Sequence, residues 1–158
     1  MFRELTRKKQ AIPQTECIAI LKQTLRGVLS VRGDDDYPYG MPLNHYYCEA
    51  DGRLYFHGGM SGHRIDAVRR HNKVSYCVMD EGVRQPGEWA LHFRSVIVFG
   101  RMEPVTDTAQ AMHIARCLSR QFTHDEDYIA REIARAGART LVCALVPEQI
   151  TGKRVTES

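Results

Sequence analysis

The sequence predicts a mainly β protein, an antiparallel β-barrel with helices at its ends. Roughly six strand-like segments are joined by hairpins and short helices, whereas a doubly wound parallel sheet needs a helix at nearly every crossover. Asp51-Gly52, between two aromatic-rich runs, is a strong hairpin signal. The 158 residues contain no repeat, low-complexity tract or linker, so we expect a single domain over residues 1–158.

The first elements follow a basic N-terminal arm. Apolar spacing predicts a short helix with Thr15 as its N-cap and Gly27 as its end. Residues 28–31 then read as a short strand. Residues 33–40 are rich in Asp, Gly and Pro, which predicts turns.

The hairpin and the loop after it come next. Residues 42–49 and 53–57 are the two expected strands, joined by the turn at residues 50–52. A glycine-rich loop follows at residues 58–62. Helical spacing then predicts a helix over residues 63–71, with Asn72 as its C-terminal cap.

The second half of the chain contains two strands, two helices and a final strand. Residues 74–79 are a compact apolar strand, and residues 89–102 form a long β-rich run. Amphipathic spacing predicts a helix over residues 107–122, which Asp107 can cap, and a second helix over residues 125–136 that ends near Gly137. The last expected strand covers residues 140–146.

Composition excludes several classes of protein. Lys and Arg number 22 and Asp and Glu 19, so the net charge of +3 is too small to indicate nucleic-acid binding. No apolar run is long enough to cross a bilayer, and the N-terminus lacks the apolar core of a signal peptide. The seven histidines show no metal-ligand spacing. We therefore expect a cytoplasmic protein that binds no nucleic acid, membrane or metal.

Residues 54–66 carry the clearest chemical signal. A strand leads into a glycine-rich loop, and the loop leads into a helix that begins with His63 and Arg64. Unpaired N–H groups at a helix N-terminus accept phosphate, and Ser61 and Arg64 can add donors. The alternative is a connecting loop that binds nothing. No catalytic residue can be named, because the members of a catalytic group meet only in the folded chain.

The sequence resembles the flavin-binding split-barrel family related to pyridoxamine 5′-phosphate oxidase. Its nitroimidazole-resistance (Nim-type) branch is the most similar. The pieces that carry the resemblance occur in the family's order over nearly the whole chain: residues 38–44, 54–58, 61–64, 72–75, 94–101 and 150–153.

The resemblance implies a six-stranded antiparallel split barrel that forms a homodimer, with flavin mononucleotide (FMN) at the subunit interface and FAD as the alternative. Residues of four segments would contact the cofactor. Those expected at the phosphate are Ser61, Gly62, His63 and Arg64. Those expected along the ring are Pro42, Leu43, Asn44, Phe56, His57 and Gly58, with Arg94 and Ser95 reaching it from the partner chain.

The resemblance also has departures. Family members often have lysine where His63 or Arg64 stands, so the phosphate contact would depend partly on histidine protonation. The arginine-bearing segment that recognises pyridoxamine phosphate is not recognisable after Gly152, so we do not expect oxidation of that substrate.

Three functions are consistent with the sequence. The first is a flavin-dependent oxidoreductase that reduces a small, flat acceptor such as a nitroimidazole, with the flavin transferring the electrons. The second is a non-catalytic module that binds flavin, deazaflavin or haem. The third is an interaction domain whose loop binds nothing.

Overall fold

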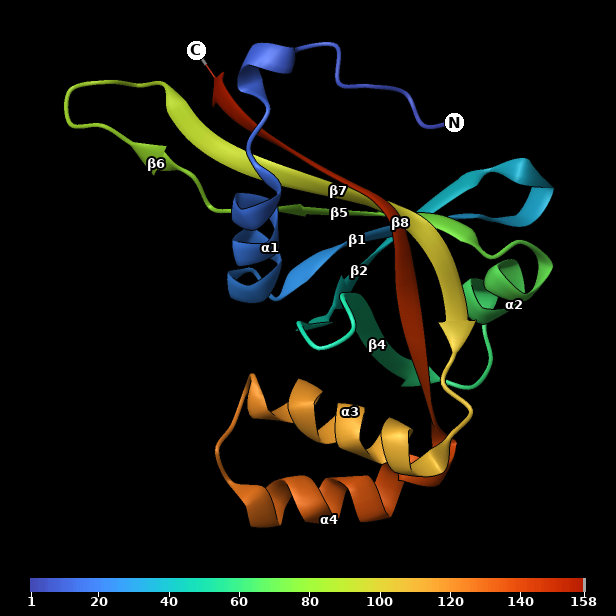
Figure 1. Cartoon of the computed structure of the whole chain (residues 1–158). Coiled ribbons are helices and arrows are strands. Elements are labelled where there is room, and N and C mark those ends of the chain that lie inside the picture. The colour runs from blue at the N-terminus through green and yellow to red at the C-terminus, as the bar shows by residue number, and fades with distance from the viewer. Residues whose placement is uncertain (158) are drawn as a thin grey trace.

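The computed structural model describes residues 1–157 and contains a curled antiparallel sheet with helices packed around it (Figure 1). The helices are α1 (Gln14–Gln23), α2 (His63–Arg70), α3 (Thr108–Arg120) and α4 (Glu126–Ala136), with short 3-10 turns at Lys8–Gln10, Asp34–Asp36 and Gly137–Arg139. The strands are β1 (Arg26–Arg32), β2 (Pro38–Asn44), β3 (Tyr46–Cys48), β4 (Arg53–Gly59), β5 (Lys73–Met79), β6 (Val83–Arg84), β7 (Leu91–Pro104) and β8 (Thr140–Glu157).

The strand order confirms the predicted fold class. The strands lie in the order β2-β1-β5-β7-β8-β4-β3, and β6 pairs with β7. Every pairing is antiparallel. Six strands have seven or more residues, whereas β3 has three and β6 has two. The sheet is therefore a six-stranded split barrel with two short additional strands.

The pair β7 and β8 forms the long axis of the sheet (Figure 1). Their register shifts between Phe99 and Gly100, which is a β-bulge. A side chain on Gly100 would overlap the Val146 carbonyl, so the bulge brings the two backbones unusually close. Pro147 lies opposite Gly100, and β8 continues to residue 157. The predicted end at residue 146 was wrong because a proline fits a strand at a bulge.

The prediction for the first helix was correct in type and wrong at both ends. Helix α1 begins at Gln14, and Pro13 rather than Thr15 occupies the N-cap position. The Pro13 carbonyl accepts hydrogen bonds from the N–H groups of Glu16 and Cys17. Gly27 lies within β1, where a Cβ would overlap the Tyr76 ring. Close packing, not helix termination, explains that glycine.

The strands around His45 differ from the prediction in one respect and agree in another. Residues 38–40 belong to β2 rather than to a turn, and His45 divides the predicted strand 42–49 into β2 and β3. The hairpin between β3 and β4 is confirmed, with Gly52 at φ +70 in its turn.

The remaining helices follow local signals closely. Asp107 and Asp125 cap α3 and α4, accepting hydrogen bonds from the N–H groups of Gln110 (2.7 Å) and Tyr128 (2.9 Å). Helix α2 ends one residue earlier than predicted, with His71 rather than Asn72 at its C-cap.

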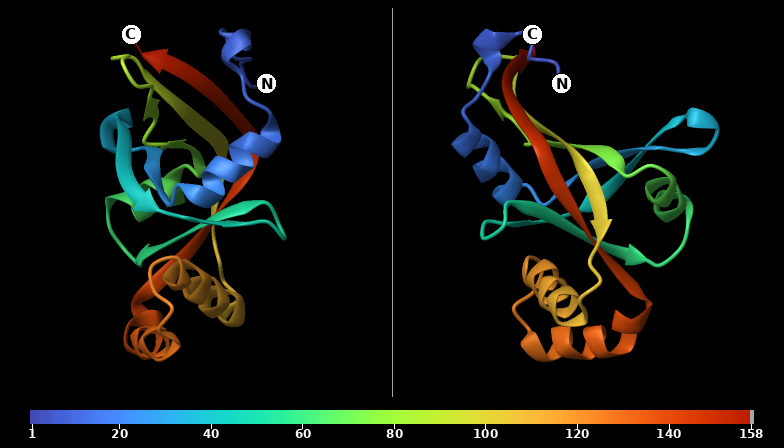
Figure 2. Two further views of the ribbon diagram at one scale, coloured as in Figure 1. Left: turned by 90° about the vertical axis from the view of Figure 1, so that its left-hand side faces the viewer. Right: turned by 45° about the vertical axis from the view of Figure 1, so that its right-hand side comes forward.

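Two groups of buried side chains stabilise the fold. The larger group fills the barrel, and Cys17, Ile20 and Leu21 of α1 belong to it. The smaller group lies between α3 and the outer side of β4 and β8, around Tyr55. The α3–α4 pair forms the bottom of the molecule in both views, and α1 lies above it, beside the sheet (Figure 2). None of the helices in residues 1–157 is long and apolar enough to span a membrane.

Candidate functional site

The loop between β4 and α2 presents an open helix N-terminus. Gly62 occupies the N-cap position at φ +120, a conformation that favours glycine, and no side chain caps the helix. Ser61, Gly62 and His63 are all exposed. The first N–H groups of α2 therefore have no capping side chain, and their partial positive charge favours an anion.

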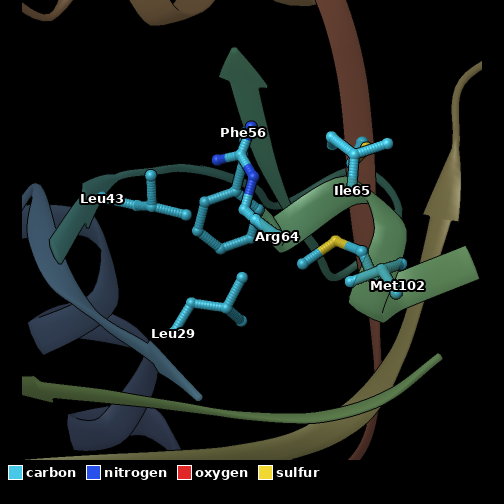
Figure 3. A pocket seen from close by; sticks show the side chains of 8 residues that line it. Leu29, Leu43, Phe56, Arg64, Ile65 and Met102 are labelled. Carbon is cyan, nitrogen blue, oxygen red and sulfur yellow. The ribbon is translucent and has the colours of Figure 1, made fainter. Parts of the chain in front are cut away.

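Arg64 adds an unpaired cation beside this loop. Its half-buried side chain extends from α2 toward β4, and the guanidinium occupies the space where a Cβ of Gly58 would lie (Figure 3). Arg70 of the same helix pairs with Asp34 at 2.6 Å, but no carboxylate of residues 1–156 forms an ion pair with Arg64. The charge of Arg64 is therefore free to attract an anionic ligand.

His63 faces away from the loop, toward the β1–β2 hairpin. Its Nε2 atom accepts a hydrogen bond from the Asp34 N–H (3.2 Å), and its ring stacks on Tyr39 with centroids 4.1 Å apart. Of the two basic side chains expected at the phosphate, His63 already has partners within the chain, whereas Arg64 is free.

Strands β2 and β4 bring residues 42–44 and 56–58 together, and we call this region the β2–β4 surface. On its inner side, Leu43, Phe56 and Arg64 line a cavity of about 10 Å³ (Figure 3). That volume holds about one water molecule. A flavin ring would therefore fit only on the outer side of the β2–β4 surface, where Pro42 and His57 are exposed.

His57 is an exposed imidazole close to the Arg64 cation. Partial loss of water around the ring lowers the pKa of His57, and the charge of Arg64 lowers it further. Histidine at this position is therefore mostly neutral near pH 7 and can donate one hydrogen bond.

A groove of about 430 Å³ begins at Asn44, the last residue of β2. Its size is within the range of small-molecule sites. Arg26 donates from Nε to the Asn44 Oδ1 atom (2.8 Å), and we call this cavity the Arg26 groove. The residues that line it are Gln23, Thr24, Leu25, Arg26, Asn44, Asp80, Glu81 and Phe122. Nothing in the sequence pattern indicated Arg26, because the groove forms only when the ends of α1, β1 and β2 meet.

Arg94 belongs to an ion network within its own chain. Its Nε donates to Asp80 (2.8 Å), and another guanidinium nitrogen donates to Glu16 (3.1 Å), which also pairs with Arg154 (2.9 Å). Hydrogen bonds from Arg154 and Arg94 lower the pKa of Glu16. Burial raises the pKa of Asp80, but hydrogen bonds from Arg94 outweigh it and lower the value overall.

Ser95 lies on the opposite face of β7 from Arg94. Val96 is fully buried in the barrel, and strand alternation places Arg94 on its side and Ser95 on the outer side. Ser95 pairs with Met79, at the far end of β5 from α2. Six residues of β5 span about 20 Å. Leu43, Phe56 and Arg64 therefore line one cavity, and the other residues of segments 42–44, 56–58 and 61–64 adjoin them in the chain, although His63 faces away. Within the same chain, Arg94 and Ser95 lie toward the end of the sheet that is far from α2.

The fold and this site define a split-barrel protein with an uncapped helix N-terminus and an unpaired arginine beside an open strand surface. The family model for pyridoxamine 5′-phosphate oxidase matches residues 13–154, and the chain belongs to that family. A search of curated protein sequences found no match.

Solved structures with the same fold include flavoproteins. A candidate 5-nitroimidazole antibiotic resistance protein of Bacteroides thetaiotaomicron has 21% identity and a TM-score of 0.76, over 93% of this chain and 87% of that one. An FAD-binding protein of Mesorhizobium loti has 24% identity and a TM-score of 0.65, over 92% and 97%. An FAD- and haem-binding protein of Mycobacterium smegmatis has 19% identity and a TM-score of 0.70, over 92% and 72%.

Proposed function

We propose that the protein is a homodimeric flavoprotein that binds FMN and reduces a small, flat acceptor such as a nitroimidazole. The observation that carries this proposal is the unpaired Arg64 at the uncapped N-terminus of α2, next to the β2–β4 surface. FAD presents a phosphate to the same loop and is the alternative cofactor. The bound flavin would supply the electron transfer.

The residues present fit such a cofactor. Gly58 has no side chain, which leaves room for the Arg64 guanidinium beside β4. The N–H groups of the first turn of α2 and the Ser61 hydroxyl would donate to the phosphate. Residues 42–44 and 56–58 would contact the ring from one side, and neutral His57 would donate a hydrogen bond at its edge. The Arg26 groove would admit the acceptor next to Asn44.

The outer side of the sheet supports a dimer. Leu29, Val78 and Val96 are fully buried in the barrel, so alternation turns Val28, Cys77 and Ile97 outward. Val28 is 40% exposed in the single chain. We call the outward side chains of β1, β5 and β7 the outer sheet face. An exposed apolar face of this kind favours a second copy of the chain.

The same face would accommodate a cofactor site shared between two protomers. Ser95 on β7 and Asn44 on β2 lie near the same end of the sheet, three strand spacings or about 14 Å apart. A two-fold axis through the outer sheet face between them would bring Ser95 of one protomer toward the β2–β4 surface of the other. Arg94 lies on the opposite face of β7 from Ser95, so it would reach the same cofactor only around the edge of the strand, through a guanidinium nitrogen that its own chain leaves free.

The absorption spectrum of the purified protein tests this function. We expect a yellow protein whose released ligand has the mass of FMN, and which oxidises a reduced nicotinamide cofactor when a nitroimidazole is added. A tightly bound flavin without turnover would favour the non-catalytic module. Bound haem or deazaflavin in place of flavin would favour it too. The alternative is included because a solved structure with the same fold binds haem. A colourless protein that does not bind added flavin would contradict both the oxidoreductase and the non-catalytic flavin-binding module.

A further inference from the structure

His45 is a fully buried histidine with four hydrogen bonds. Its backbone N–H donates to the Leu25 carbonyl (2.9 Å), and its carbonyl accepts from Gln121 Nε2 (2.9 Å). On its ring, Nε2 lies 2.7 Å from the Leu21 carbonyl and Nδ1 lies 2.9 Å from the Tyr76 hydroxyl. This one residue therefore connects α1, the residue before β1, β5 and the C-cap of α3 at the point where β2 ends.

The partners of His45 determine where its protons lie. A carbonyl only accepts, so Nε2 carries a hydrogen and donates to Leu21, in the last turn of α1 where carbonyls lack helical partners. Burial lowers the pKa of His45, which leaves Nδ1 as an acceptor near pH 7. The Tyr76 hydroxyl also lies 2.8 Å from the Leu43 carbonyl, so its single hydrogen serves two acceptors, His45 and Leu43.

This network ends at the β2–β4 surface. Leu43 and Asn44 directly precede His45 in the chain and are two of the residues expected along the flavin ring. His45 also bonds to Leu25, which lines the Arg26 groove, and to Gln121, the neighbour of the lining residue Phe122. Loss of a hydrogen bond of His45 would therefore shift both the end of β2 and the residues that line the Arg26 groove.

We propose that His45, acting through Tyr76, is a positioning residue that fixes the end of β2 for the flavin ring. The proposal rests on the proposed function, because it concerns the same cofactor site. If His45 only filled space in the core, its hydrogen bonds would have no effect on cofactor binding. The distinction is testable because the chain contains a second buried tyrosine whose hydroxyl lies elsewhere.

The test compares Tyr76→Phe with Tyr55→Phe. Both tyrosines are fully buried, but the Tyr55 hydroxyl donates to Asp51 at the β3–β4 turn, beneath α3. Each variant loses one buried hydroxyl, so both should lower the melting temperature by a few degrees. Only Tyr76→Phe should weaken FMN binding, by about threefold to tenfold.

Amide hydrogen exchange in the protein without flavin supplies the second measurement. Tyr76→Phe should accelerate exchange of the His45 amide, which donates to Leu25, and leave the Gly52 amide, which donates to Cys48, unchanged. Tyr55→Phe should do the reverse. His45→Gln provides a second route to the same result if Tyr76→Phe folds poorly.

Each outcome decides the proposal. Equal loss of FMN affinity in the two tyrosine variants, or none in Tyr76→Phe, would overturn it. If wild-type protein binds no FMN, the proposed function fails and the exchange measurement alone decides whether the network fixes β2. Unchanged His45 exchange in both Tyr76→Phe and His45→Gln would then overturn the positioning role.

Discussion

Arg64 and His63 are adjacent residues with different capacities to bind an anion. His63 is committed to the Asp34 N–H and the Tyr39 ring, whereas the Arg64 guanidinium has no acidic partner among residues 1–156. A guanidinium also keeps its charge at every relevant pH, and an imidazole is mostly neutral at pH 8. At the scale of single residues, the proposed phosphate contact would therefore depend on Arg64.

Replacing the two residues should give unequal losses. At pH 8, Arg64→Ala should weaken FMN binding about tenfold to a hundredfold, because one charge-assisted contact contributes roughly 1.5–3 kcal/mol. His63→Ala should have a smaller effect. Arg69→Ala, an exposed arginine of the same helix, is the matched control and should change affinity little. A fluorescence titration that finds no loss for Arg64→Ala would refute the loop assignment.

His45 predicts a pH dependence of stability. Because its pKa is lowered on folding, the unfolded chain takes up a proton first as pH falls below about 6.5, and stability is lost until the folded form is protonated as well. His57, whose pKa is also lowered, contributes in the same direction.

We therefore expect the free energy of unfolding to fall with pH below 6.5, and to fall less steeply in His45→Gln. One proton accounts for at most about 1.4 kcal/mol per pH unit. Urea unfolding between pH 5 and 7.5 measures the slope. An identical slope in wild type and His45→Gln would show that His45 is not the titrating group.

At the scale of elements, sequence patterns predicted the turns and helix starts that depend on interactions between residues close together in the chain. The Asp51-Gly52 turn and the Asp107 cap of α3 were predictable because their chemistry lies within a few residues. The loop before α2 was predictable for the same reason. The errors at Gly27, His45 and Pro147 all depend on contacts with distant strands, which no local pattern contains.

The same limit applies to the candidate site. Arg64 could be singled out because it stands beside glycines at a helix start. The ion network of Arg94 with Asp80 and Glu16 could not be foreseen, because its members are 14 and 78 residues apart in the chain. Arg26 and Tyr76 also gain their roles only from strand register.

The β4–α2 connection gives a prediction at this scale. A methyl group on Gly58 would overlap the Arg64 guanidinium, whereas one on Gly59 would meet only the Ser61 carbonyl, at 3.7 Å. Gly58→Ala should therefore displace Arg64 and weaken FMN binding nearly as much as Arg64→Ala, while Gly59→Ala binds normally. Because a flexible side chain yields easily, both variants should melt close to wild type. Equal FMN affinity in the two glycine variants would contradict the arrangement of Arg64 described above.

At the scale of the whole molecule, the outer sheet face should join two copies. Val28→Lys would place a charge in the middle of an apolar contact, at a cost of several kcal/mol if the lysine stays buried and unpaired. Light scattering should then report a monomer with weakened flavin binding. Met112→Lys is the matched control, since Met112 on α3 is 44% exposed and Val28 is 40% exposed. A Val28→Lys protein that remains dimeric would exclude this face as the interface.

The most direct test of the central claim, that the loop before α2 binds the flavin phosphate, is a titration of flavin-free protein with FMN and with riboflavin. The two ligands share the ring and ribityl chain and differ only in the phosphate. We expect FMN to bind at least tenfold more tightly, because its phosphate contacts Arg64 and the N–H groups of α2. Arg64→Ala should reduce the ratio of FMN affinity to riboflavin affinity. Equal affinities for FMN and riboflavin in the wild-type protein would contradict the claim.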